Sequence, residues 1–410
     1  RMTPISYIRI NKGEPSIVNR RQLSQQYENV PFKRGQWVDA WCADMDIATY
    51  EKLDFCPRGA ELPDGYYNLY RGLRIEGVES SNPKASFEPL LKHMRILAGN
   101  DDKCFDYFLK YMAQLVQLPG VKPNVGLVFS SDQGVGKNVF FEKFVKSVLG
   151  KNYMLQTADQ NHIFGRFNMV NQKLIVIVDE ASGKDSFMNS ERMKNNITCE
   201  TIPYEKKGID GITINDYCRY IFFSNNKTPI KIEMSDRRFV VFRCSNDVRN
   251  NRPYFKDLIK NYLQNDDVMR NFYDYLMGID LSDFDPVNDR PITEVYKDIQ
   301  SVNIPVLARW LENKYQNAMA DNVKEVLYTA SELFTEYKQA YHSWGYEGRV
   351  TKTSFGRDIK AYNGVVKKRS KRGMVYTINY EEVGAYLEMK GYIEELEEID
   401  VSDTNIDGNI

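Results

Sequence analysis

The segment that most constrains the fold of this chain is residues 125–138, Val-Gly-Leu-Val-Phe-Ser-Ser-Asp-Gln-Gly-Val-Gly-Lys-Asn. An apolar run is followed by a glycine-containing turn and then by apolar residues at helical spacing. This pattern predicts a buried strand, a tight turn and a helix. Such a turn exposes successive backbone N–H groups, and the positive end of the helix dipole adds to them. The segment therefore predicts a cradle for phosphate oxygens, with Lys137 reaching the β- and γ-phosphates of a nucleotide.

The turn departs from the usual G-x-x-x-x-G-K-[ST] pattern at two positions. Ser131 stands at the first glycine, and Asn138 stands at the Ser/Thr position. Serine makes the turn less freely than glycine, whereas an asparagine carbonyl oxygen can ligate Mg²⁺. The alternative is an ordinary strand-to-helix turn with a surface lysine. The residues predicted to line the nucleotide are Ser131, Asp132, Gln133, Gly134, Val135, Gly136, Lys137 and Asn138.

Composition excludes several classes of protein. The 410 residues, 42% hydrophobic and 27% charged, suffice for two to four globular domains. The longest purely aliphatic run, residues 174–178, is too short to span a bilayer. The six cysteines form no C-x-x-C pair, so neither a structural zinc site nor a disulfide framework is expected. The net charge of −1 does not decide for or against nucleic acid. Residue 1 is an arginine, so we expect a piece of a longer polypeptide or a processed chain.

Periodicity and composition divide the chain into five regions. An irregular, aromatic-rich region is followed by a helical, collar-like segment. An α/β domain then alternates buried strands with helices. An acidic linker leads to an α+β unit, and the chain ends in an acidic tail without a basic residue. In order, these regions are residues 1–85, 86–120, 121–285, 295–393 and 394–410, with the linker at residues 283–291.

A second apolar strand, residues 174–178, ends in Asp179 and Glu180, about 40 residues after Lys137. Open α/β sheets bind their ligands at the carboxyl ends of the strands. Asp179 is therefore predicted to hold Mg²⁺ together with Asn138, directly or through water. Glu180 is predicted to orient and polarise the water that attacks the γ-phosphorus. The alternative is an acidic pair that only caps a core strand.

Two further segments place polar residues next to predicted strands. Asn225 follows an apolar strand and is predicted to sense the γ-phosphate, with Asn226 as the near alternative. An asparagine turn after a strand is common in isolation. Arg237 and Arg238 precede another strand, and a guanidinium suits phosphate oxygens. In ring ATPases such an arginine reaches the nucleotide of a neighbouring subunit; the alternative is a surface arginine pair.

Two predicted hairpins carry clustered positive charge. Residues 202–214 alternate around a glycine turn, which predicts a hairpin with Lys206 and Lys207 near its tip. Such a hairpin can grip a phosphate backbone. In the C-terminal unit, helices at residues 329–343 and 354–362 precede a basic hairpin, the outline of a winged helix. Solvated turns are the alternatives. The basic residues of the C-terminal hairpin are Lys367, Lys368, Arg369, Lys371 and Arg372.

The order and spacing of these segments resemble those of the superfamily 3 helicases of viruses and phages. The resemblance is greatest to the poxvirus- and phage-type primase-helicases, and it spans roughly residues 40–380. Residues 164–168, before the acidic pair, resemble the corresponding segment of that group. Lys194, followed by residues 204–208, looks like the extra motif that separates superfamily 3 from other ATPases. Residues 67–72 resemble the entry segment of the same proteins.

This resemblance implies an AAA+-like P-loop NTPase core and a hexameric ring that moves along single-stranded DNA by hydrolysing ATP. It also implies a primase or polymerase domain in the same full-length polypeptide. Lys194 is predicted to contact DNA, and the C-terminal winged helix is predicted to bind duplex DNA. The expected location is the cytoplasm of the host cell. We therefore predict an ATP-dependent DNA helicase with ATP and Mg²⁺ as cofactors. Its predicted catalytic residues are Lys137, Glu180, Asn225, Arg237 and Arg238.

Two alternatives remain open. A non-catalytic origin-binding or scaffold module with a vestigial nucleotide site would account for the departures at Ser131 and Asn138. An RNA-directed helicase is the other, because superfamily 3 includes such enzymes.

Overall fold

The structure is a computed structural model that describes residues 7–11, 14–32, 35–159, 161–165, 168–179, 190–205, 212–225, 230, 232–371 and 373–393. The chain divides into two units. The first comprises residues 1–231 and 237–297, and the second comprises residues 232–236 and 298–410. Among the residues that the structure describes, no helix is both long and apolar enough to cross a membrane.

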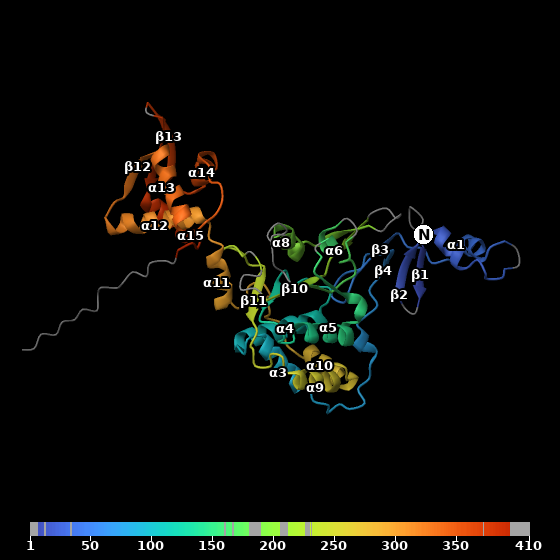
Figure 1. The fold of residues 1–410 in the computed structure, drawn as a ribbon. Helices are drawn as coiled ribbons and strands as arrows, with labels where there is room; N and C mark the ends of the chain where they lie inside the picture. The colour runs from blue at the N-terminus through green and yellow to red at the C-terminus, as the bar shows by residue number, and fades with distance from the viewer. Residues whose placement is uncertain are drawn as a thin grey trace, which may run out of the picture. The chain divides into compact units, whose positions relative to one another are not determined.

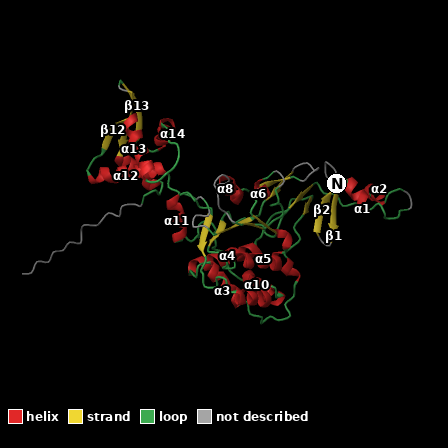
Figure 2. Ribbon diagram, in the orientation of Figure 1, coloured by secondary structure: helices red, strands yellow, loops and turns green. Residues whose placement is uncertain are grey.

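A five-stranded parallel sheet forms the centre of the first unit (Figure 2). Its strand order is β11-β5-β10-β7-β6, and every neighbouring pair is parallel. β5, β7 and β10 are buried along their whole length, as expected of strands covered on both faces. The predicted α/β class is thereby confirmed. The strands are β5 (Gly126–Ser130), β6 (Met154–Thr157), β7 (Ile175–Val178), β10 (Arg219–Ser224) and β11 (Phe239–Arg243).

Helices with large apolar faces pack against one side of this sheet (Figure 1). The ring of Phe108 lies at the centre of this layer, with its centroid 5.3 Å from that of Phe129 and 5.8 Å from that of Phe242. The helices expected between residues 87 and 118 are therefore present, and they share one core with the sheet. The helices of this layer are α3 (Glu88–Leu97), α4 (Asp102–Gln117), α5 (Lys137–Phe144), which continues as the π-helix η2 (Val145–Leu149), and α10 (Asp266–Met277).

The opposite face of the sheet carries short elements. Ile197 of α8 (Ser190–Thr198) lies beside Gly126, where a Cβ atom would come within 3.3 Å of its side chain. After α8, β8 (Thr201–Tyr204) pairs antiparallel with β9 (Ile212–Asn215), as the predicted hairpin requires. Lys206 and Lys207 lie outside the described residues. The remaining helices of the first unit are α6 (Asn161–Phe164), η3 (Lys151–Tyr153), α9 (Arg252–Asp257) and the π-helix η4 (Leu258–Leu263) that extends α9.

The N-terminal region, predicted to be irregular over residues 1–85, contains short regular elements. β1 and β2 pair antiparallel, β3 and β4 pair parallel, and Asn19 caps α1 by accepting a hydrogen bond from the backbone of Gln22. Tyr7, Trp37 and Trp41 pack together into a small core of their own, which stabilises strands and helices too short to show a periodic pattern. The elements are β1 (Tyr7–Asn11), β2 (Glu14–Val18), α1 (Arg20–Gln26), α2 (Trp37–Ala43), β3 (Lys52–Asp54), β4 (Tyr66–Asn68) and η1 (Arg74–Gly77).

The acidic segment at residues 283–291 was expected to be a linker, and the structure shows it packed against α4. The hydroxyl of Tyr107 donates to the carbonyl of Pro286 at 2.6 Å, and its ring contacts Phe284. These contacts place the segment in the first unit, and the boundary between the units falls inside α11 (Glu294–Val302).

The second unit is a three-stranded antiparallel sheet, in the order β12-β14-β13, with helices around it. Its core includes Trp310, Tyr337 and Phe355. Both predicted helices are present, and Thr329 starts α13 with a capping box that uses Glu332. The tail at residues 394–410 lies outside the described residues. The elements are α12 (Val306–Ala320), β12 (Glu325–Thr329), α13 (Ala330–Ser343), α14 (Lys352–Asp358), η5 (Ile359–Ala361), β13 (Val365–Ser370), β14 (Gly373–Asn379) and α15 (Tyr380–Met389).

Candidate nucleotide site

The turn between β5 and α5, residues 131–136, lies at the carboxyl edge of the parallel sheet. Ser130, the last residue of β5, is opposite Ser224 of β10 and Arg243 of β11. Three strands therefore end side by side at this edge. Ser131 is buried, and its backbone N–H donates to the carbonyl of Ser224 at 3.2 Å. The predicted succession of strand, turn and helix is confirmed.

Two glycines give the turn its shape. Gly134 and Gly136 have φ values of 95° and 93°, in the left-handed region that glycine enters without steric cost. A Cβ atom at Gly136 would also lie 2.4 Å from Phe255 and 2.9 Å from His93. A side chain at Gly136 is therefore excluded by both the backbone conformation and the space around it.

Lys137 is the first residue of α5, and its side chain turns back over the edge of the sheet. Its Nζ atom donates to the carbonyl of Ser224 at 3.1 Å and to Oδ1 of Asn225 at 3.4 Å. Burial lowers the pKa of Lys137, and the positive charge of Arg243 lowers it further. The side chains of Cys244 and Asp179 act in the opposite direction and raise the pKa of Lys137. Asn225 is exposed. The structure thus brings together two residues that were predicted to act on the same phosphate.

Asp179 follows β7 at the same edge of the sheet. Its Oδ2 atom accepts a hydrogen bond from Nε2 of Gln156 at 2.6 Å, and its charge raises the pKa of Lys137. Asn138 is exposed on the first turn of α5. Both side chains offer hard oxygen ligands of the kind that Mg²⁺ prefers. Glu180, the predicted water-activating residue, lies outside the described residues.

The described part of the chain holds no group of three or more His, Cys, Asp or Glu side chains that could bind a metal ion. Mg²⁺ typically takes one or two protein carboxylates and completes its shell with water and substrate phosphates. The donor set of Asp179 and Asn138 fits that mode of binding, in which the metal arrives together with the nucleotide.

Arg237 and Arg238 lie at the opposite edge of the sheet from the turn. Because β11 runs parallel to β5, the residues that precede β11 are at the amino edge, where the carbonyl of Arg238 accepts from the N–H of Gly126 at 2.8 Å. A five-residue strand separates the two edges by roughly 13 Å. Neither arginine therefore belongs to the turn of its own chain, and the prediction that one of them acts on a neighbouring subunit stays a prediction.

The sequence did not single out Arg243, which lies at the carboxyl edge. Its guanidinium donates to Oγ of Ser130 at 3.2 Å, and the residue is exposed. It is the charged end of an otherwise buried strand, Phe-Val-Val-Phe-Arg, and that pattern could have identified it. Together with Lys137 it places two positive charges beside the turn.

The segment that follows β11 also holds the turn in place. Oδ2 of Asp132 accepts from Arg249 at 2.9 Å and from Asn246 at 3.3 Å. The backbone N–H of Asn250 donates to the carbonyl of Gly134 at 3.0 Å. These contacts come from a segment more than 100 residues away in the chain, and no local pattern indicates them.

The residues predicted to bind DNA differ in accessibility. Lys194, on α8, is 3% exposed and donates to Oε1 of Glu191 at 3.0 Å, so this conformation does not present its ammonium group to a nucleic acid. Lys368, Arg369 and Lys371 are exposed on β13 and its turn. Lys367 is half-buried, with its ammonium group 5.4 Å from the ring centroid of Tyr376. Arg372 lies outside the described residues.

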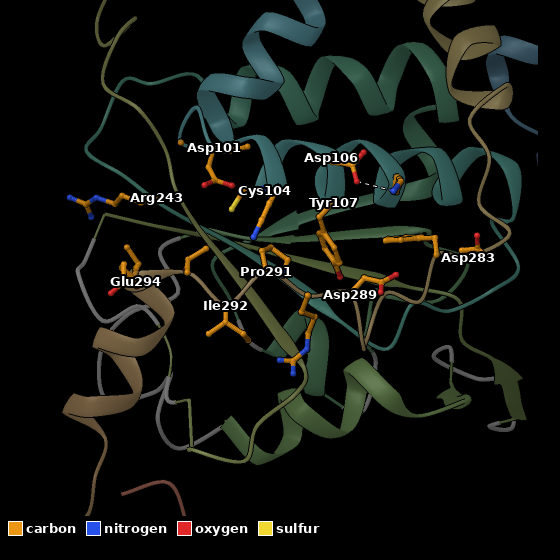
Figure 3. Close-up of a pocket in the computed structure, with 18 residues that line it drawn as sticks. Asp101, Cys104, Asp106, Tyr107, Arg243, Asp283, Asp289, Pro291, Ile292 and Glu294 are labelled. Atoms are coloured by element: carbon orange, nitrogen blue, oxygen red, sulfur yellow. Dashed lines mark hydrogen bonds and ion pairs between the residues drawn. The ribbon is translucent and has the colours of Figure 1, made fainter. Parts of the chain in front are cut away.

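A groove of about 860 Å³ opens beside this site, between the start of α4 and residues 283–295 (Figure 3). Arg243 lies at one end of it and Asp283 at the other. Both signs of charge line the groove, and Asp106 pairs with Lys110 at 2.8 Å. Its lining includes none of the residues of the turn, so the groove is separate from the predicted phosphate cradle.

Comparison with known proteins gives three kinds of match: a family, a relative and solved structures. A family of unknown function, DUF5906, matches residues 128–238, the segment from the middle of β5 to the residue before β11. The chain is also similar to the DNA primase-polymerase of Nitratiruptor phage NrS-1, with 28% identity over 247 residues. That match covers 59% of this chain and 33% of the phage protein, so the chain matches about a third of the length of its relative.

Solved structures of the C-terminal region of the NrS-1 protein share the fold. One apo structure superposes with a TM-score of 0.65 and 20% sequence identity, covering 91% of this chain and 94% of that chain. A second apo structure, of residues 305–718 of that protein, gives the same TM-score and covers 93% of its own chain. The chain is thus a homologue of this phage protein, and its structural counterpart is the C-terminal region.

Proposed function

We propose that the first unit binds and hydrolyses ATP with Mg²⁺ at the turn between β5 and α5. The observation that carries this proposal is the position of Lys137, whose Nζ atom lies 3.1 Å from the carbonyl of Ser224 and 3.4 Å from Oδ1 of Asn225. A lysine and an amide meet where three parallel strands end, which is where open α/β sheets bind ligands.

In this proposal the backbone N–H groups of residues 131–136 and the ammonium group of Lys137 hold the phosphates. Asn138 and Asp179 hold the magnesium ion, which neutralises phosphate charge when it is bound. Asn225 orients the attacked phosphate and the water beside it. Glu180 is the proposed water-activating residue. Arg243 adds a second positive charge from the same chain, which the sequence did not predict.

We further propose that the chain is the helicase part of a phage replication protein that works as a ring on single-stranded DNA. The similarity to a phage primase-polymerase supports a replication role, and it supports a primase or polymerase domain in the same full-length polypeptide. Arg237 or Arg238 would then complete the site of a neighbouring subunit. The expected place of action is the cytoplasm of the infected cell.

The second unit is the proposed DNA-binding module, with the outline of a winged helix. α13 and α14 precede the β13–β14 hairpin, whose exposed Lys368, Arg369 and Lys371 form a strip of positive charge. Such a strip would contact phosphates and carry little sequence information.

The test is ATPase activity with and without single-stranded DNA, measured on size-fractionated protein so that the assembly state is known. We expect Lys137→Ala to lower DNA-stimulated hydrolysis by about 100-fold or more, because it removes a charge aimed at the transferred phosphate. Lys146→Ala is the matched control, since Lys146 is an exposed lysine just beyond α5 that pairs with Glu142 one helical turn before it. Turnover retained in Lys137→Ala would contradict the proposal.

The same assay separates the alternatives. Stronger stimulation by single-stranded RNA than by single-stranded DNA would indicate an RNA-directed helicase. Nucleotide binding without hydrolysis, together with tight duplex binding, would indicate an origin-binding or scaffold module.

A further inference from the structure

A buried histidine lies directly beneath the candidate phosphate turn. His93, on α3, is 0% exposed, and its ring packs among those of Phe140, Tyr254 and Phe255 at centroid distances of 5.8 to 6.0 Å. An imidazole buried in this way destabilises the fold unless its two ring nitrogens find hydrogen-bond partners. Both nitrogens of His93 have one.

The two hydrogen-bond partners determine which ring nitrogen of His93 carries the proton. Nε2 of His93 lies 3.4 Å from the carbonyl oxygen of Gly136, and Nδ1 lies 3.1 Å from the hydroxyl of Tyr254. A carbonyl oxygen can only accept, so Nε2 carries the proton. Burial lowers the pKa of His93 to about 4, which keeps the ring neutral at physiological pH. Nδ1 of the neutral ring is then an acceptor, and the hydroxyl of Tyr254 donates to it.

The carbonyl that His93 holds belongs to the residue where the turn becomes a helix. Gly136 is the N-cap of α5, its φ is 93°, and its carbonyl also accepts from the N–H of Phe140 at 3.1 Å. Lys137 comes next in the chain. A displacement of the Gly136 peptide would therefore move both the ammonium group of Lys137 and the N–H groups of the first helical turn.

We propose that Tyr254 and His93 form a hydrogen-bonded relay that positions the phosphate turn. The hydroxyl of Tyr254 fixes the ring of His93, and the ring holds the carbonyl of Gly136. The relay joins α9 and α3 to the start of α5, so two helices that are distant in sequence set the orientation of the turn. His93 is a positioning residue, because it is fully buried and acts on the turn through the carbonyl of Gly136. The proposal rests on the nucleotide site described above.

Substitutions of the ring distinguish a positioning bond from simple packing. His93→Gln retains an amide N–H near the position of Nε2, whereas His93→Asn has an amide that ends near Nδ1 and leaves the Gly136 carbonyl without its donor. Tyr254→Phe removes one hydroxyl and keeps the ring. Tyr262→Phe is the matched control, since Tyr262 is also partly buried against the same core on the following helical segment.

The first measurement is amide hydrogen exchange of residues 134–140 in nucleotide-free protein. We expect His93→Asn and Tyr254→Phe to speed exchange there by about fivefold, the equivalent of the roughly 1 kcal/mol of one net hydrogen bond. We expect His93→Gln to speed exchange less than His93→Asn does, because it keeps the donor to Gly136 although it loses the acceptor for Tyr254, and we expect Tyr262→Phe to leave exchange within about twofold of the native rate. Equal exchange in all four variants, or equal acceleration in His93→Gln and His93→Asn, would overturn the relay.

The second measurement is the affinity for ATP with Mg²⁺, which should fall by a similar factor in His93→Asn and Tyr254→Phe and fall less in His93→Gln. Native affinity in Tyr254→Phe would also overturn the relay. Failure of the nucleotide site itself has a different signature. In that case the native protein would bind no ATP, and the exchange differences among the variants would remain.

Discussion

Nζ of Lys137 lies 3.4 Å from Oδ1 of Asn225, although the two residues are 88 positions apart in the chain. The contact exists because β5 and β10 are parallel neighbours that end in register, with Ser130 opposite Ser224. Two residue types suited to binding and orienting a phosphate are thus placed together by strand order, and the contact requires no special loop conformation.

This contact predicts separate effects on binding and on chemistry. Asn225→Ala should lower kcat for ATP by about 100-fold, because it removes a positioned amide that acts on the reacting phosphate. Nucleotide affinity should change by less than about threefold, since Lys137 and the backbone of the turn remain. Steady-state kinetics and equilibrium binding give the two values. Asn261→Ala, at an exposed asparagine on η4, is the control, and an unchanged kcat in Asn225→Ala would remove Asn225 from the site.

Arg243 should contribute to nucleotide binding in the same chain. Arg243→Ala removes a positive charge close to Lys137, and we expect about tenfold weaker binding of ATP, the range of one charge-assisted hydrogen bond. The free energy of unfolding should change little because the residue is exposed. Isothermal titration and chemical denaturation measure the two effects. Arg252→Ala, at an exposed arginine of α9, should bind ATP as the native protein does; equal affinities for both variants would contradict the prediction.

The burial of His93 predicts a loss of stability in mild acid. Its pKa in the folded chain is about 4, compared with an ordinary value of 6.5, and the Tyr254 hydroxyl bonded to it has its pKa raised to about 12. Below pH 6.5 the imidazole of His93 is protonated in the unfolded chain but stays neutral in the folded chain, so the free energy of unfolding falls as the pH drops from 6.5 towards 4. The total loss of unfolding free energy over this range is about 3 kcal/mol.

Denaturant unfolding of the native protein and of His93→Gln, at several pH values between 4.5 and 7.5, isolates this contribution. The stability of the native protein should fall more steeply with acid than that of His93→Gln. Parallel curves would show that His93 becomes protonated in the folded state as readily as in the unfolded state.

The exposed cations of the β13–β14 hairpin should contribute to DNA binding in a salt-dependent way. Replacing Lys368, Arg369 and Lys371 together by alanine should weaken duplex binding and reduce the slope of log K against log salt by about 3. Fluorescence anisotropy over a range of salt concentrations measures both. A triple variant at exposed Lys338, Lys360 and Lys390 has the same change of charge elsewhere in the unit, and an equal loss in that variant would show a non-specific effect.

The parts of the site that local sequence encodes could be predicted. Gly136 and Lys137 are adjacent in the chain, and the strand, turn and helix around them follow from hydrophobic pattern and glycine chemistry. Asn225 could be predicted because it follows an apolar strand. The position of Arg243 at the end of an apolar strand is visible in the sequence, but its neighbours depend on the register of β11 against β5, so the sequence alone did not connect it to the turn.

Other features depend on tertiary packing. His93 lies on the apolar face of an amphipathic helix and reads as a core residue, and only the approach of α9 gives it Tyr254 as a partner. The burial of Lys194 beside Glu191 likewise does not follow from its position in a motif. The short N-terminal strands are stabilised by aromatic contacts between segments, so their own sequences carry little periodic signal.

Lys137 and the pair Arg237–Arg238 lie at opposite edges of one sheet, a strand length apart. Within the proposed ring, each chain would therefore supply a phosphate-binding turn at one edge and a guanidinium at the other. In a single chain these two parts of a catalytic site would be too far apart to act on the same nucleotide. ATP hydrolysis would then require assembly. Diluting the protein until the ring dissociates would abolish turnover, although every individual chain stays folded and intact.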